Sequence, residues 1–199
     1  MSELIMQFQD LEINSIQQLN GIADILFNKI IDEKNKIDLI PWLVEILQFV
    51  YIPHNLCINE SQTHINMRSL ILEKCQKNFT EFVDSKKMTN IIETVTLIGL
   101  LYVNNIIPEI IITNCITILF NKLKNFEDYV IGTLTTLLSI IVLDDKIINK
   151  ISTIKYVDEK LIIDINTYLD RLITNTKMSK KDKFMIMDYI EAYNKFMPF

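Results

Sequence analysis

The residue types best suited to metal binding gather in one stretch in the middle of the chain. His54, Cys57 and His64 stand together in IPHNLCINESQTH and are the most plausible metal ligands of the sequence. Protein zinc sites use four ligands, or three and a water, usually in motifs such as CxxC or HExxH. Neither motif occurs in the sequence, and no fourth ligand stands at a standard spacing. The stretch is therefore interpreted as a polar loop, and neither a metal nor a cofactor is expected.

Nucleophilic and phosphate-binding chemistry find little support either. The chain has 3 glycines, too few for a Gly-rich phosphate loop, and no GxSxG elbow occurs. Cys75 and Cys115 lie on apolar stripes, where cysteine acts as a small core residue more often than as a nucleophile. The adjacent Asp144 and Asp145 stand at an expected helix boundary, where capping explains them. The sequence thus predicts a protein that is not an enzyme.

One short pattern suggests a docking motif. Tyr51, Leu56 and Cys57 in YIPHNLC approximate the series of tyrosine, four residues, leucine and a hydrophobic residue by which short helices bind cap-binding proteins. Cys57 is a weak final hydrophobic residue, and Pro53 would break the helix that the motif adopts. Two interpretations stay open, a site for a cap-binding protein and a chance match at a helix end.

The last stretch of the chain is the best candidate for a binding surface. Lys180, Lys181 and Lys183 cluster at the start of a helix expected over residues 179–197. Cations at a helix N-terminus oppose the helix dipole, so a partner with acidic groups would explain them, as would ordinary solvation. The apolar positions of this helix could serve a core; they are Phe184, Met187, Ile190 and either Tyr193 or Ala192.

Composition limits the kind of protein that carries these residues. The chain has 199 residues, of which 49% are hydrophobic, with 3 Gly and 4 Pro, so one domain of long buried elements over residues 1–199 is expected. A net charge of −5 argues against binding nucleic acid over the whole surface, although a local basic patch stays possible. The longest uncharged stretch, Tyr129 to Leu143, is shorter than the roughly 20 residues of a membrane span. No membrane segment and a cytoplasmic location are expected, since the N-terminus lacks a signal and the 3 cysteines form no disulfide pattern.

Helical periodicity begins after residue 14. Ser15 and Gln18 have the spacing of a capping box, and the helix that follows is expected to run to about residue 34. Its expected inward residues are Ile16, Leu19, Ile22, Ile25, Leu26 and Ile30. Asp38 is expected to cap a second helix that continues to Tyr51, with Pro41 in its first turn.

The clearest apolar stripe lies in the next helix, over residues 68–83. It consists of Leu70, Leu72, Cys75, Phe79, Phe82 and Val83. A break at DSKKMT precedes another helix over residues 90–105, which contains Gly99. Glycine within a helix costs about 1 kcal/mol relative to alanine. A neighbouring helix that packs very close at Gly99 would compensate for this cost.

Residues 106–124 are rich in β-branched residues but are expected to be helical. Glu109, Thr113, Thr117 and Asn121 are each four apart, a spacing that gathers polar residues on one helical face. Three further helices are expected over residues 127–143, 158–175 and 179–197, the last opened by Ser179 with Asp182. No strand is expected between them.

The helices expected from the sequence group into pairs. The pairs begin near residues 15, 65, 107 and 158, a repeat of roughly 40 to 50 residues that is typical of two-helix solenoid units. The expected fold is all-α, a HEAT-like solenoid of about four to five antiparallel helix pairs. An irregular helical bundle stays open as the alternative.

Five segments, in order and at compatible spacing, resemble the middle HEAT-repeat domain of translation initiation factor 4 gamma. They are QQLNGIADILFNKIID, WLVEILQFV, RSLILEKCQKNF, LIGLLYVNNIIPEIIITNCI and KKDKFMIMDYIE. The resemblance extends from about Ser15 to the C-terminus and depends on the order of the segments. It implies a cytoplasmic scaffold in translation initiation that binds a DEAD-box RNA helicase, promotes its activity and can contact RNA.

The resemblance also implies site residues. Phe184 would belong to the helicase-binding surface, with Lys181, Lys183 and Asp188 beside it. The sequence departs from the family at residues 1–14, where a counterpart of the first helix is lacking, and at DSKKMT, where relatives have a longer insertion. A reduced scaffold is therefore expected. Other interpretations stay open: a scaffold of nuclear cap-binding, splicing or message-surveillance complexes, and a small regulator that accepts a partner helix in an apolar groove.

Overall fold

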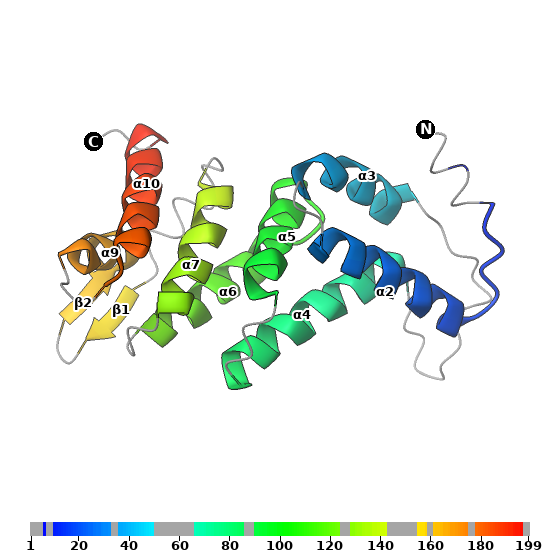
Figure 1. Ribbon diagram of the computed structural model, residues 1–199, viewed down its shortest axis with the longest axis horizontal. Helices are drawn as coiled ribbons and strands as arrows, with labels where there is room; N and C mark the ends of the chain where they lie inside the picture. The colour runs from blue at the N-terminus through cyan, green and yellow to red at the C-terminus, as the bar shows by residue number, and fades with distance from the viewer. Residues whose placement is uncertain are drawn as a thin grey trace. The chain divides into compact units, whose positions relative to one another are not determined.

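Almost all of the regular secondary structure that the structure describes is α-helical. A computed structural model describes residues 6, 10–32, 36–49, 66–85, 90–123, 128–142, 155–158, 161–174 and 178–196. These residues form eight helices and one two-stranded hairpin (Figure 1). The helices are α2 (Ile16–Asp32), α3 (Lys36–Phe49), α4 (Met67–Ser85), α5 (Ile91–Val103), α6 (Glu109–Lys122), α7 (Asp128–Ile141), α9 (Ile165–Ile173) and α10 (Lys180–Phe196). The all-α class expected from the sequence is confirmed, apart from the short hairpin.

The chain divides into two compact units. The first comprises Met1–Leu97 and the second Ile98–Phe199, so the division falls within α5. Each unit has its own buried apolar residues and is described by itself. The expectation of a single domain over residues 1–199 stays a prediction.

In the first unit, α2 begins at the expected capping box. The Gln18 N–H donates to Ser15 Oγ at 3.1 Å, and the Asn14 N–H donates to Gln18 Oε1 at 2.8 Å. The helix packs mainly on α4. Its buried residues are Leu19, Ala23, Leu26, Phe27, Ile30 and Ile31. The expected inward position of Ile25 is wrong, because Phe27 and Ile31 extend the buried face on the other side and leave Ile25 71% exposed.

The start of α3 differs from the expectation. This helix begins at Lys36, which places Asp38 and Pro41 within it, and Pro41 does not stand in the first turn. Proline inside a helix lacks the N–H that would bond to the carbonyl four residues earlier. The buried Ile40, Leu43, Ile46 and Leu47 anchor α3 on either side of this gap.

The long helix α4 forms where the apolar stripe over residues 68–83 predicts it. Asn66 caps it, since its Oδ1 accepts the Ser69 N–H at 2.8 Å while its own N–H donates to Ser69 Oγ at 3.1 Å. The buried residues of α4 are Met67, Leu70, Ile71, Cys75, Phe79 and Phe82. The stripe read from the sequence is thus confirmed, except that Leu72 and Val83 are only half-buried.

In the second unit, α6 confirms the helical interpretation of the stretch 106–124 over Glu109–Lys122, while residues 106–108 precede the helix. Pro108 is its N-cap, in extended conformation. The hydroxyls of Thr113 and Thr117 donate to the carbonyls of Glu109 and Thr113 at 3.0 and 2.8 Å. These bonds satisfy the hydroxyls within the helix, which explains how a segment rich in β-branched and hydroxyl residues stays helical.

The second unit is built around α7. This helix packs against α6 and α10. Val130, Leu134, Leu137, Leu138 and Ile141 are all 0% exposed. Gly99 of α5 also lies against it: a Cβ added at Gly99 would stand 3.0 Å from Ile140 Cγ2. The close helix contact expected at Gly99 is therefore confirmed.

The main departure from the sequence analysis is a hairpin. Strands β1 (Lys155–Asp158) and β2 (Leu161–Asp164) pair antiparallel, with Lys155 opposite Asp164. The sequence predicts a helix from residue 158, and this prediction is wrong for residues 158–164, because α9 begins only at Ile165. The β-branched and aromatic residues of KYVD and LIID favour strands, and a two-residue separation suits a hairpin. Asp164 ends β2 and caps α9, accepting the Thr167 N–H at 2.9 Å.

Candidate functional site

The last helix has one buried and one exposed apolar face. Its buried face packs against α7 and α9 and includes Ile186 and Tyr189, which are 0% and 2% exposed. Phe184 and Met187 lie on the other side and are 62% and 48% exposed. The interpretation that Phe184 and Met187 serve a core is therefore wrong. Both are available to a partner.

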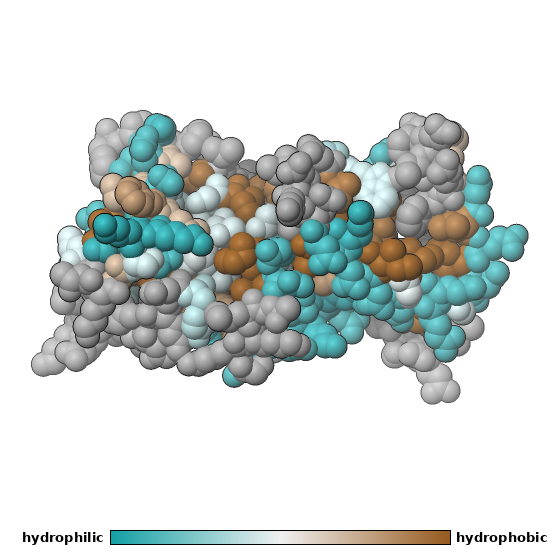
Figure 2. Space-filling view, viewed as in Figure 1, coloured by the Kyte–Doolittle hydropathy of each residue, from teal (hydrophilic) through white to brown (hydrophobic). Residues whose placement is uncertain are grey.

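Charged residues flank these two apolar side chains. Lys181 and Asp188 are exposed, whereas Lys183 is half-buried. Lys181, Phe184 and Asp188 follow one another at three- and four-residue steps, so they share a face of the helix. We call Lys181, Phe184, Met187 and Asp188 the α10 surface. Figure 2 shows hydrophilic surface over the start of α10 and apolar surface beside it along the helix.

The start of α10 is fixed by its cap. The Asp182 N–H donates to Ser179 Oγ at 3.1 Å, and the Ser179 hydroxyl donates to the Asp182 carboxylate. Asp182 is buried at 6% exposure, and this hydrogen bond satisfies its carboxylate there. The cap expected from the sequence is confirmed, and it fixes where α10 begins.

The orientation of α10 is also held by α9. The Tyr189 hydroxyl donates to Asn166 Oδ1 at 2.9 Å. Burial raises the pKa of the Tyr189 phenol above its ordinary value, so this hydroxyl stays a neutral donor well above neutral pH. Tyr168 of α9 in turn meets Phe120 of α6 edge to face, with ring centroids 5.3 Å apart. The α10 surface thus stands on a packed support within its own unit.

The other candidate residues of the sequence fall into two groups. His54, His64, Tyr51, Leu56, Cys57, Asp144 and Asp145 lie outside the described residues. The metal site and the cap-binding motif considered for them are therefore not described by the structure. Cys75 and Cys115 are buried, and burial raises the pKa of the Cys115 thiol to about 11. Within the described ranges, no group of three or more His, Cys, Asp and Glu side chains could hold a metal ion.

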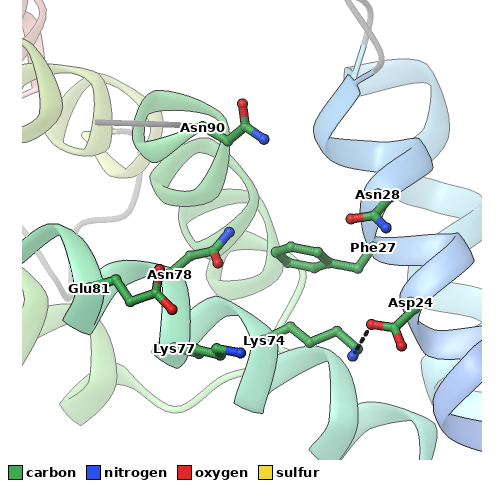
Figure 3. A pocket seen from close by; sticks show the side chains of 8 residues that line it. All are labelled: Asp24, Phe27, Asn28, Lys74, Lys77, Asn78, Glu81 and Asn90. Carbon is green, nitrogen blue, oxygen red and sulfur yellow. Dashed lines mark hydrogen bonds and ion pairs between the residues drawn. The ribbon is translucent and has the colours of Figure 1, made fainter. Parts of the chain in front are cut away.

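Sequence reasoning missed a polar groove in the first unit. It has a volume of about 340 Å³ and lies between α2 and α4, beside the start of α5 (Figure 3). Its lining residues are Asp24, Phe27, Asn28, Lys74, Lys77, Asn78, Glu81 and Asn90. The signal in the sequence was the polar back of α4, where Lys74, Lys77 and Glu81 recur at helical spacing. That spacing alone does not show what faces it.

Comparison with known proteins adds no family assignment. No protein-family model matches the chain, and no curated protein matches it. Among the helices that the structure describes, none is long and apolar enough to cross a membrane.

Proposed function

We propose that this chain is a cytoplasmic scaffold of translation initiation that binds a DEAD-box RNA helicase through the α10 surface. The observation that carries the proposal is the exposure of Phe184 and Met187 on a helix whose opposite face is buried. Large apolar side chains that stay exposed together mark protein-binding sites more often than singly scattered ones do. The order of the five helical segments that resemble the initiation-factor domain supports the choice of partner.

The charged residues of the α10 surface are placed as the polar rim of a protein interface would be. Lys181 and Asp188 flank the apolar pair, while Glu191 and Lys195 form an i,i+4 ion pair at 2.8 Å farther along. Protein interfaces commonly place an apolar centre within such a rim, where charges direct association more than they add affinity. Phe184 and Met187 would then supply most of the binding energy, and Lys181 would affect the association rate.

The proposal includes a HEAT-like arrangement of helices. Within the second unit, α6 packs on α7, α10 on α7, and α9 on α10. Packing of each helix on its neighbours supports the proposal that the second unit holds the α10 surface rigidly. A stiff scaffold raises the ATPase activity of a two-lobed helicase only if it binds the closed form of that enzyme more tightly than the open form. Direct contact with RNA and with a cap-binding protein are further parts of the proposal.

The first experiment measures binding to an initiation factor 4A type helicase by calorimetry, together with its RNA-dependent ATPase rate. Changing Phe184 and Met187 together to alanine should weaken binding by about thirtyfold or more, as loss of an interface centre does. Ile25→Ala is the matched control, because Ile25 on α2 is also a largely exposed apolar residue, at 71%. Equal binding by the double variant and the control would refute the role of the α10 surface. No binding by the unchanged chain would refute the helicase as partner.

One observation favours a second candidate, a helical regulator that accepts a partner helix. Most of the described residues of α7 are buried, as those of a central helix surrounded by others would be. On α6, Ile110, Ile111 and Ile118 are all partly exposed, at 62%, 37% and 39%. Ile111 and Ile118 are seven residues apart, two turns of one helical face, and an amphipathic partner helix could pack its apolar face against such residues. If Ile110→Ala weakened capture of a partner while the α10 double variant did not, this candidate would replace the helicase scaffold.

A further inference from the structure

The groove between α2 and α4 combines charged and amide side chains in an unusual proportion. Its lining has two lysines, two carboxylates and three asparagines, with Phe27 as the aromatic residue. Phe27 is 6% exposed, and Figure 3 shows its ring pointing from α2 toward α4. A volume of about 340 Å³ falls at the lower end of the range of ligand sites in proteins. The groove is therefore large enough for a short stretch of a ligand.

At one end of the groove, a positive and a negative side chain already balance each other's charge. Lys74 of α4 forms an ion pair with Asp24 of α2, and their side chains are 21% and 61% exposed. Lys77 stands three residues farther along α4 and is exposed. Figure 3 shows its ammonium near the Lys74 side chain, on the side of α4 that faces α2. Lys77 has no hydrogen bond or ion pair to any residue that the structure describes, so it is the cation that a ligand can reach without breaking an existing pair.

The three asparagines leave amide groups available in the groove. Asn78 Nδ2 donates to Thr94 Oγ1 at 3.4 Å, a long bond that does not use the amide oxygen of Asn78. The side chains of Asn28 and Asn90 make no hydrogen bond within the described part of the chain. Asn90 has a φ of 59° and accepts the Thr94 N–H at its carbonyl, which fixes it at the start of α5. The amides of Asn28 and Asn90 each offer two N–H donors and an acceptor, and the amide of Asn78 offers its oxygen and one further N–H.

These groups discriminate between classes of ligand. Two lysines and two carboxylates line the groove, so it lacks the excess of positive charge that the successive phosphates of a nucleic-acid backbone require. An extended peptide alternates N–H donors and C=O acceptors, which amide side chains match pairwise. A single acidic side chain of that peptide adds one negative charge, which Lys77 balances. Phe27 provides an apolar contact for the peptide carbons.

We propose that the groove between α2 and α4 binds an extended peptide segment that carries one acidic side chain. The carboxylate of the peptide pairs with Lys77, and its backbone bonds to the side-chain amides of Asn28, Asn78 and Asn90. The site belongs to the first unit and does not depend on the proposed role of α10 in the second. The chain would then bind one partner through α10 and a peptide segment through this groove.

The test uses the full chain labelled with ¹⁵N and a library of acetylated, amidated pentapeptides with a central glutamate. The library should shift the side-chain amide signals of Asn28, Asn78 and Asn90 saturably. A library with central glutamine should bind about tenfold more weakly, because it lacks the charge-assisted bond to Lys77. Inorganic phosphate and an oligouridine RNA serve as the competing ligands.

Two variants with opposite expected effects make the test sharper. Lys77→Ala should weaken binding of the glutamate library about tenfold, whereas Gln76→Ala, at the exposed neighbouring position on α4, should not. Asp24→Asn should strengthen binding, because it removes a carboxylate and frees Lys74. Both Lys77 and Asp24 are exposed, so neither change threatens folding.

Each outcome decides the proposal. Saturable shifts that Lys77→Ala weakens and Asp24→Asn strengthens support it. Absence of shifts with the glutamate library overturns it, as does equal binding of both libraries. Shifts of the same amides by RNA or phosphate at lower concentration would reassign the groove to phosphate ligands.

Discussion

Gly99 offers the most direct test of how closely the helices of the second unit pack. A Cβ built at Gly99 would stand 3.0, 3.2 and 3.3 Å from Cγ2, Cβ and Cδ1 of Ile140. Contacts this short force the neighbour to move by a few tenths of an ångström. Gly132 of α7 and Gly21 of α2 are also within helices, but an added Cβ there would meet nothing within 4 Å. The three glycines therefore separate helix propensity from packing.

The expected changes in the free energy of unfolding follow from helix propensity and packing. Replacing a helical glycine with alanine stabilises by about 0.5–1 kcal/mol where the space is open, as at Gly132 and Gly21. At Gly99 the same gain is opposed by an overpacking cost of about 1–3 kcal/mol. Gly99→Ala should therefore range from neutral to about 2.5 kcal/mol destabilising. Its free energy of unfolding should lie at least about 1 kcal/mol below that of Gly132→Ala.

The assay is urea unfolding followed by circular dichroism, repeated in an Ile140→Ala background. That change removes Cγ2 and Cδ1 of Ile140, two of the three crowded atoms at Gly99. Gly99→Ala should be less costly there by about 1 kcal/mol, a coupling that only neighbouring residues show. If Gly99→Ala stabilised the chain as much as Gly132→Ala does, the close approach of α5 to α7 would be refuted.

Two further predictions concern α9 and the buried thiol of α6. Burial by itself would raise the pKa of Asp164, but hydrogen bonds from the Thr167 hydroxyl and from nearby backbone N–H groups together lower it. The stabilising effect of Asp164 is therefore complete above its unfolded pKa of about 4 and lost as pH falls through the lower folded value. Asp164→Ala should cost about 0.5–2 kcal/mol in unfolding at pH 7 and progressively less below pH ~4, while Asp164→Asn should keep most of the cap without this pH dependence. Because burial raises the pKa of Cys115 to about 11, its thiol should resist a thiol-disulfide reagent at pH 8 in the folded chain and react in urea, as peptide mass mapping would show. Rapid labelling of Cys115 in the folded chain would contradict its burial.

Local signals in the sequence predicted most helices because helix caps and periodicity act between near neighbours. Ser15 with Gln18, and Ser179 with Asp182, make the capping bonds that their spacing predicted. The four-residue spacing of the threonines on α6 likewise outweighed its β-branched composition. The sequence does not predict the hairpin before α9, although KYVD and LIID are rich in strand-forming residues, because β-branched residues are also common in helix α6 and do not by themselves distinguish strand from helix.

The faces that helices bury were less accessible to sequence reasoning. On α10, apolar residues occur all around the helix, at Phe184, Ile186, Met187 and Tyr189 among others. Periodicity alone does not select between two apolar faces of one helix. Packing against α7 and α9 selects Ile186 and Tyr189 for burial and leaves Phe184 exposed. The same holds for Ile25 of α2, which sequence reasoning placed inward.

The sequence by itself determined that this chain is mostly helical, where several helices are capped, and that a close neighbour at Gly99 would offset the cost of a helical glycine. These features follow from bonds and steric limits within a few residues. Only the tertiary structure decided which apolar residues stay exposed on α10 and that Asp24 meets Lys74, fifty positions away, to form one end of a groove. Such juxtapositions depend on how separate helices pack, and a pattern along one helix carries no information about the helix it will face.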